Sequence, residues 1–216
     1  MTTAAPDQLT VVSVRPFGAD DLLEALRRTP LHGFDGAQPY LGAELELVTV
    51  DPGTLAPAQR YVLSEGVCRA HALRAALAPH GIDPFALDGG VWITTADEPD
   101  IETPLLPPIV ELSHEPDGRV VPLVNDGLHR VYAAREVGAL LTVVRATGVP
   151  TEYPYYALAL ERGWDDVVAL DELPDGFQKK TYRQPTGYKA LFRDFNAVYP
   201  GIQQARKATN PAHLRA

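Results

Sequence analysis

The sequence of 216 residues contains little cysteine and no long apolar run. Its one cysteine, Cys68, excludes an internal disulfide and a zinc site built from cysteines. No stretch of 18 or more apolar residues occurs, which excludes an ordinary transmembrane helix. The N-terminus also lacks the basic and apolar regions of a signal peptide. These absences predict a cytoplasmic protein without a membrane partner.

The charged residues are distributed unevenly along the chain. Apolar residues make up 45% and charged residues 22% of the sequence, which is typical of one large globular domain or a domain with an appendage. The net charge is −9, yet residues 177–216 contain eight of the 19 Lys and Arg residues and only one of the 28 Asp and Glu residues. A basic tail after an acidic body indicates either a polyanionic ligand or docking of the tail onto the body.

Strand and helix patterns are mixed along the chain, which predicts an α+β fold. Apolar and β-branched runs predict strands over residues 9–14, 44–50, 109–112, 120–124 and 140–145. Helical spacing predicts helices over residues 20–28, 67–77 and 188–198. Asp88-Gly89-Gly90 predicts a hairpin turn, and an acidic loop is expected over residues 97–108.

The most informative stretch is residues 126–130, Asp-Gly-Leu-His-Arg, which joins a predicted strand to a predicted helix that ends at Gly138. A helix N-terminus offers unpaired N–H groups and a partial positive charge, so it favours an anionic ligand. Gly127 allows the backbone to approach such a ligand closely. Arg130 is suited to phosphate, and His129 can donate to phosphate or carry a proton near neutrality.

Asp126 leaves two interpretations of this stretch open. As a functional residue, it can hold a magnesium-bound water or accept a proton from a hydroxyl. As a structural residue, it caps the helix while Arg130 forms a surface salt bridge. The choice of residue types favours the functional interpretation.

The stretch resembles the phosphate-binding box of the ParB/sulfiredoxin-like superfamily, because Ala133-Ala134 follow in the helix and strands flank it at Pro108-Ile109-Val110 and residues 140–144. The resemblance covers residues 44–146 and implies a small mixed sheet with flanking helices as a nucleotide-binding core. Residues 1–43 are then an N-terminal extension, and residues 147–216 are a basic C-terminal extension packed on the core.

Departures from the superfamily pattern narrow the expected activity. Leu128 stands where sulfiredoxins carry their catalytic cysteine, so sulfinic-acid reduction is not expected. No helix-turn-helix pattern follows Ala146, so DNA partition is not expected either. The His129-Arg130 pair is most similar to the ParB-like free-serine kinases.

That similarity implies the roles of the site residues. The expected phosphate-binding residues are Gly127, Leu128, His129 and Arg130. The expected catalytic residues are Asp126, His129 and Glu65, with Asp126 also as the metal ligand. Glu65 lies where such kinases place the glutamate that activates the acceptor hydroxyl, although a surface role is an alternative, and Glu111 and His114 are weaker candidates. Additional phosphate or substrate contacts are expected from Gln59, Arg60, Lys180, Arg183 and Lys189.

The resemblance therefore predicts an ATP-dependent phosphotransferase that acts on a small hydroxylated metabolite, with ATP or CTP and Mg²⁺ as cofactors. One alternative is a nucleotide switch or hydrolase that docks a protein partner. Another is a nucleic-acid-binding or nuclease module, because basic and aromatic residues alternate in the tail around Lys180, Tyr182 and Tyr188. The same alternation equally suits a tail packed on the core with its aromatics inward.

Overall fold

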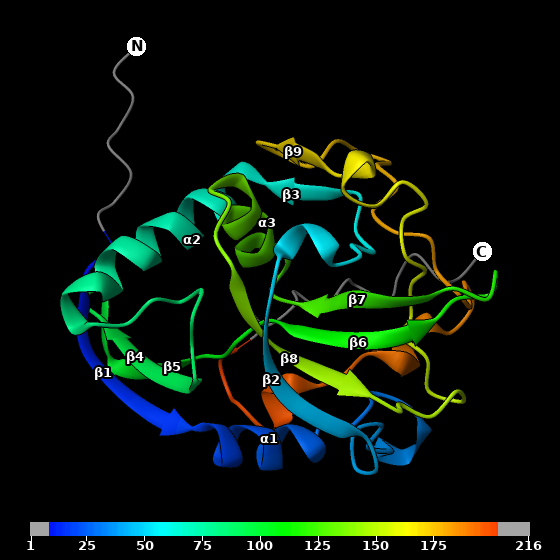
Figure 1. Cartoon of the computed structure of the whole chain (residues 1–216), viewed down its shortest axis with the longest axis horizontal. Helices are drawn as coiled ribbons and strands as arrows, with labels where there is room; N and C mark the ends of the chain where they lie inside the picture. Colours follow the sequence, from blue (N-terminus) through cyan, green and yellow to red (C-terminus); the bar gives the residue numbers. More distant parts are fainter. Residues whose placement is uncertain (1–8, 203–216) are drawn as a thin grey trace.

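A four-stranded mixed sheet forms the centre of the computed structural model, which describes residues 9–202 (Figure 1). The strand order is β2–β8–β6–β7, with bounds Glu44–Val50, Leu141–Thr147, Ile109–His114 and Val120–Asp126. β8 is antiparallel to β2 and parallel to β6, while β6 and β7 are antiparallel. The predicted α+β class is confirmed.

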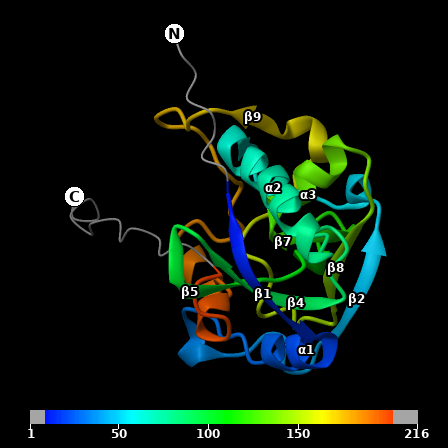
Figure 2. The same cartoon turned by 90° about the vertical axis from the view of Figure 1, so that its left-hand side faces the viewer.

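Helices cover both faces of this sheet because its strands alternate their buried side chains. On one face, Val143 of β8 packs with residues of α2 (Ser64–Leu77) and α3 (Leu128–Glu136). On the other face, Val144 packs with residues of α1 (Ala19–Arg27). The views in Figures 1 and 2 show α1 on the opposite side of the sheet from α2 and α3.

Two smaller sheets complete the fold. β1 (Val11–Gly18), β4 (Gly89–Thr95) and β5 (Glu98–Leu105) form an antiparallel sheet in that order, and its core contains Leu77 of α2. β3 (Tyr61–Leu63) pairs in parallel with β9 (Val168–Leu170). The 3-10 helices span Phe34–Gly36, Pro52–Thr54, Ala78–His80, Gly163–Asp166, Tyr188–Leu191 and Phe195–Ala197.

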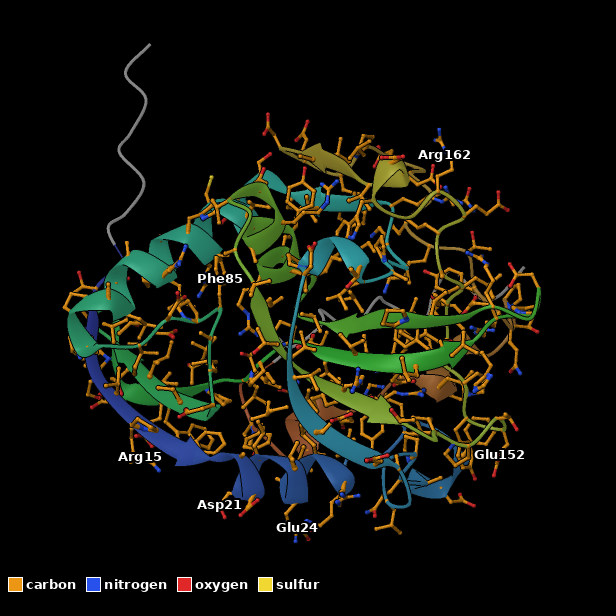
Figure 3. The ribbon with its side chains drawn as sticks, viewed as in Figure 1. Arg15, Asp21, Glu24, Phe85, Glu152 and Arg162 are labelled. Atoms are coloured by element: carbon orange, nitrogen blue, oxygen red, sulfur yellow. The ribbon has the colours of Figure 1, made fainter. Side chains whose placement is uncertain are left out.

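Side chains follow the usual division between an apolar interior and a charged surface. Phe85 is 1% exposed and lies within the core beneath α2, where the Arg74 guanidinium covers its ring at 4.7 Å (Figure 3). Charged residues project at the periphery of Figure 3, among them Arg15, Asp21, Glu24, Glu152 and Arg162.

The hairpin turn predicted at Asp88-Gly89-Gly90 is wrong. Gly89 and Gly90 begin β4, and Gly90 lies opposite Phe17 of β1. A Cβ atom on Gly90 would lie 2.1 Å from the Phe17 ring. These glycines therefore make room for a neighbouring strand instead of reversing the chain.

The acidic loop predicted over residues 97–108 is mostly strand β5. Pro99 and Pro104 suggested a loop, but β5 is the edge strand of its sheet. An edge strand tolerates proline because one side of its backbone needs no hydrogen-bond partner.

The helix predicted over residues 188–198 is also wrong, because two short 3-10 helices replace it. The backbone between them bonds to a distant loop: His32 N donates to Phe192 O at 3.0 Å, and Asp194 N donates to Pro30 O at 2.8 Å. These long-range bonds take the place of the helical ones. By contrast, the strand predicted over residues 44–50 is confirmed at both ends, and α2 begins three residues before its predicted start.

Candidate functional site

Gly127 sets the geometry of the junction between β7 and α3. Its φ is +82°, a left-handed conformation that favours glycine, and a Cβ atom here would lie 2.8 Å from Pro108 Cβ. The Gly127 carbonyl accepts hydrogen bonds from Arg130 N at 2.9 Å and Val131 N at 3.1 Å. Because glycine has no side chain to cap the helix, the first N–H groups of α3 remain available to an anion.

Arg130 places a cation in the first turn of α3. Its Nη1 atom is buried and has no hydrogen-bond partner among the described residues. Burial lowers the pKa of Arg130 to about 10, and the negative charge of Asp126 opposes that shift. The guanidinium is thus still charged at neutral pH, and a buried donor without an acceptor is costly unless a ligand supplies one.

His129 connects the motif to β3 and α2. Its Nε2 atom accepts a hydrogen bond from Leu63 N at 3.1 Å, so the ring proton must lie on Nδ1. The ring packs so closely on α2 that a Cβ atom at Gly66 would lie 2.5 Å from His129 Cδ2. Burial lowers the pKa of His129, with Asp126 opposing the shift, so the ring is neutral near pH 7. Only Nδ1 is left to donate to a ligand.

A pocket of about 1310 Å³ opens in front of this motif and is strongly cationic. Asp126 is the single acidic residue among the described residues that line it. Six of the lining residues are basic: Arg69, Arg130, Lys179, Lys180, Lys189 and Arg193. On a chain whose net charge is −9, this concentration of positive charge indicates an anionic ligand.

Aromatic side chains form another wall of the pocket. We use the name aromatic wall for Tyr156, Tyr182, Tyr188 and Phe192, all of which line the pocket. The Tyr182 and Tyr188 rings stack with centroids 3.9 Å apart, and the Tyr156 and Phe192 rings meet edge to face at 4.6 Å. Such a wall offers apolar contact area and ring faces to a bound molecule.

Several residues predicted from the sequence meet at this pocket. Residues 126–130 line it together with Gln59, Lys180 and Lys189. Gln59 donates from Nε2 to Tyr61 O at 2.8 Å. These residues come from segments far apart in the sequence, so the fold brings them together.

Three other predicted residues do not line the pocket. Glu65 is exposed in the first turn of α2, although the adjacent Gly66 does line it. Arg60 donates from Nη2 to Thr181 Oγ1 at 3.3 Å. Arg183 forms a buried ion pair with Glu115, at the end of β6. The phosphate or catalytic roles proposed for these residues stay predictions.

Sequence reasoning missed the buried network beneath the pocket. Arg193 donates to both carboxylate oxygens of Glu111, at 2.8 and 2.9 Å, and Tyr40 and Asn125 donate to the same carboxylate. Asn125 and Arg193 also line the pocket. Glu111 therefore ties β6 to the C-terminal segment. No local pattern could reveal this pair, because its members are 82 residues apart.

Asp126 is the one carboxylate among the described lining residues that could hold a metal ion in the pocket. No group of three or more His, Cys, Asp or Glu side chains in residues 9–202 could hold an ion by itself. Mg²⁺ is commonly bound by one or two carboxylates together with substrate phosphates and water, and one aspartate can supply that carboxylate.

No helix within residues 9–202 combines the length and hydropathy needed to cross a membrane.

Comparison with known proteins agrees with the resemblance seen in the motif. The model of the ParB CE domain matches residues 21–168, from α1 to the start of β9. No curated protein and no solved structure matches the chain. Since the matched stretch covers more than half of the chain and contains the whole β7–α3 motif, the chain belongs to the ParB CE domain family.

Proposed function

We propose that the pocket binds a nucleoside triphosphate, ATP or CTP, together with Mg²⁺. The observation that carries this proposal is the cationic lining around the uncapped first turn of α3, with Arg130 Nη1 buried and unpartnered among the described residues. The N–H groups at Leu128 and His129 and the Arg130 guanidinium would bind phosphate oxygens. Asp126 would hold the metal ion, which when bound neutralises charge on the phosphates.

We further propose that the terminal phosphoryl group passes to a small hydroxylated metabolite. The acceptor oxygen forms a bond to the γ-phosphorus while the bond between that phosphorus and the β-phosphate oxygen breaks, and the nucleoside diphosphate leaves. Asp126 would take the hydroxyl proton, since it is the one acidic residue among the described residues that line the pocket. The chain's main contribution would be to position the reactants and to stabilise negative charge.

A nucleotide switch that docks a protein partner is the second candidate. It is favoured by the scarcity of carboxylates, because Asp126 alone among the described lining residues would have to serve both metal and hydroxyl. Measurement of nucleoside diphosphate release, ADP from ATP or CDP from CTP, separates the two functions. Release that requires a hydroxylated acceptor supports the phosphotransferase, whereas binding without turnover, or turnover without any acceptor, supports the switch.

Isothermal titration with ATP, ADP and CTP in the presence of Mg²⁺ tests the binding itself. Arg130→Ala should weaken binding about tenfold or more, because charge-assisted bonds to phosphate are lost. Arg135→Ala is the matched control, since Arg135 lies exposed in the last turn of α3 and does not line the pocket. Absence of binding to the wild-type chain, or equal binding by both variants, would remove the proposal.

A further inference from the structure

The pocket is built from two stretches of the chain. Arg69, Asp126 and Arg130 lie inside the stretch that matches the family model. Lys179, Lys180 and Lys189 lie beyond it, as do three members of the aromatic wall, Tyr182, Tyr188 and Phe192. The second half of the lining therefore comes from the C-terminal segment, outside the stretch that the family model matches.

Lys180 is the best positioned cation of that second half. Its ammonium group donates to the Tyr155 hydroxyl at 3.0 Å and to the Tyr156 hydroxyl. It also lies over both rings, 5.3 Å from the Tyr155 centroid and 4.6 Å from the Tyr156 centroid. Two hydroxyls and two ring faces thus hold the ammonium in one place.

No carboxylate of residues 9–202 forms an ion pair with Lys180. Burial raises the pKa of the Tyr155 hydroxyl well above its usual value, so this tyrosine stays neutral and does not balance the charge. Ring faces and neutral hydroxyls compensate an ammonium less completely than an anion does. A half-buried ammonium that contacts only neutral groups favours the binding of an anionic group.

The backbone around Lys180 is fixed in place. Lys179 O accepts from Arg60 N at 2.9 Å, and Thr181 O accepts from Leu158 N at 2.9 Å. The Tyr155 hydroxyl that accepts from Lys180 donates in turn to Asn125 O at 3.5 Å, one residue before Asp126. Lys180 is therefore linked through one tyrosine to the strand that carries the motif. Its ammonium can bind an anion without a rearrangement of the chain.

The size of the pocket leaves room for a second molecule. Its volume of about 1310 Å³ exceeds the roughly 300–1000 Å³ that is usual for a single small ligand. A nucleotide whose phosphates lie on the first turn of α3 need not fill the half bounded by the lysines and the aromatic wall.

We propose that Lys180 and the aromatic wall form a second anion subsite, distinct from the site of the nucleotide phosphates. Its identification as the acceptor subsite rests on the proposed phosphotransferase function. The acceptor would then be a hydroxylated compound that bears a carboxylate or phosphate group. Lys180 binds the acidic group, and the aromatic wall contacts the remainder of the molecule, which presents its hydroxyl toward Asp126.

Inorganic phosphate serves as the probe, titrated by calorimetry into the full chain. One titration uses the free protein, and another uses protein saturated with Mg²⁺ and adenylyl imidodiphosphate, which occupies the position of the terminal phosphate. Phosphate should still bind to the saturated protein, and Lys180→Met should weaken that binding at least fivefold. Lys180→Arg should retain most of it, and Arg119→Met, at an exposed ion pair with Asp117, should not change it.

Lys180→Met keeps the apolar stem of the side chain, and thermal unfolding checks that the variant is folded. If it is not folded, Lys180→Gln replaces it.

The proposal is overturned if phosphate fails to bind the saturated protein, or if it binds Lys180→Met as tightly as wild type. Lys180→Met that weakens nucleotide binding as much as Arg130→Ala overturns it too, since Lys180 is then a nucleotide ligand. If the nucleotide analogue itself does not bind, the proposed function fails alone. Phosphate binding to free protein that needs Lys180 but not Arg130 would still support a separate subsite.

Discussion

Gly127 and Pro108 determine how the first turn of α3 faces the pocket. Gly127 combines a φ of +82° with a contact too close for any side chain, so two independent constraints require glycine. Gly138, at the other end of the same helix, has a φ of +62° but open space around it. Comparison of Gly127 with Gly138 therefore separates two contributions to the free energy of unfolding, the left-handed backbone conformation and the steric contact with Pro108.

Gly138→Ala should lower the free energy of unfolding by about 1 kcal/mol, through backbone strain alone. Gly127→Ala should lower it by at least about 1 kcal/mol more, because the new methyl group collides with Pro108. Urea denaturation of both variants measures the difference. Equal losses would show that the packing between Gly127 and Pro108 is not a real constraint.

His129 should make stability depend on pH. Burial lowers its pKa in the folded chain, so the unfolded chain binds a proton more readily. Its contribution is therefore complete above the unfolded pKa of about 6.5 and is lost as the pH falls below that value. The free energy of unfolding should drop between pH 7.5 and pH 5.5 by less in His129→Gln than in wild type. His114→Gln, at an exposed position in β6, is the matched control. A drop in His129→Gln as large as that of wild type would contradict the assignment.

At the scale of elements, β6 holds the C-terminal segment through two buried ion pairs. Glu111 pairs with Arg193, and Glu115, just after the strand, pairs with Arg183. Arg193 also donates to the carbonyls of Tyr153, Pro154 and Leu191. These two arginines of the basic tail therefore dock onto acidic residues of the body. Arg206, Lys207 and Arg215 of the same tail lie outside the described residues.

Glu111→Gln should lower the free energy of unfolding by about 3–5 kcal/mol, because it leaves the buried Arg193 guanidinium without its counter-charge. Glu102→Gln is the matched control, since Glu102 also pairs with an arginine across strands but at the surface. The control should lower the free energy of unfolding far less than Glu111→Gln does, because water screens an exposed ion pair. Chemical denaturation measures both, and similar small losses would contradict the role given to Glu111.

The sequence predicted best those elements whose pattern is local. The strand over residues 44–50 and the junction at Gly127 follow from alternation, turn chemistry and helix capping within a few residues. The turn predicted at Gly89-Gly90 is wrong because glycine occurs both in turns and where strands pack closely. Only the position of Phe17, which is distant in sequence, decides between the two. The segment over residues 188–198 has helical spacing, yet hydrogen bonds to residues 30–32 determine its structure. The Glu111–Arg193 pair has no local signal at all.

At the scale of the whole molecule, the chain encloses a positive pocket within an acidic protein. Low-dielectric walls lined by charge of one sign concentrate counter-ions and raise the local concentration of an anionic substrate. One side of the pocket comes from the ParB CE domain stretch, and the other comes from residues 179–202. The stretch that matches the family model and the C-terminal segment therefore both contribute basic residues to the pocket.

The most direct test of the proposed nucleotide site is a crystal structure of the chain with Mg²⁺ and a non-hydrolysable ATP analogue. We predict that the triphosphate lies on the first turn of α3, within hydrogen-bonding distance of the Leu128 and His129 amides and of the Arg130 guanidinium, with the metal ion against Asp126. A nucleotide bound elsewhere, or phosphates that contact the lysines of residues 179–189 and leave Arg130 unpaired, would contradict the account.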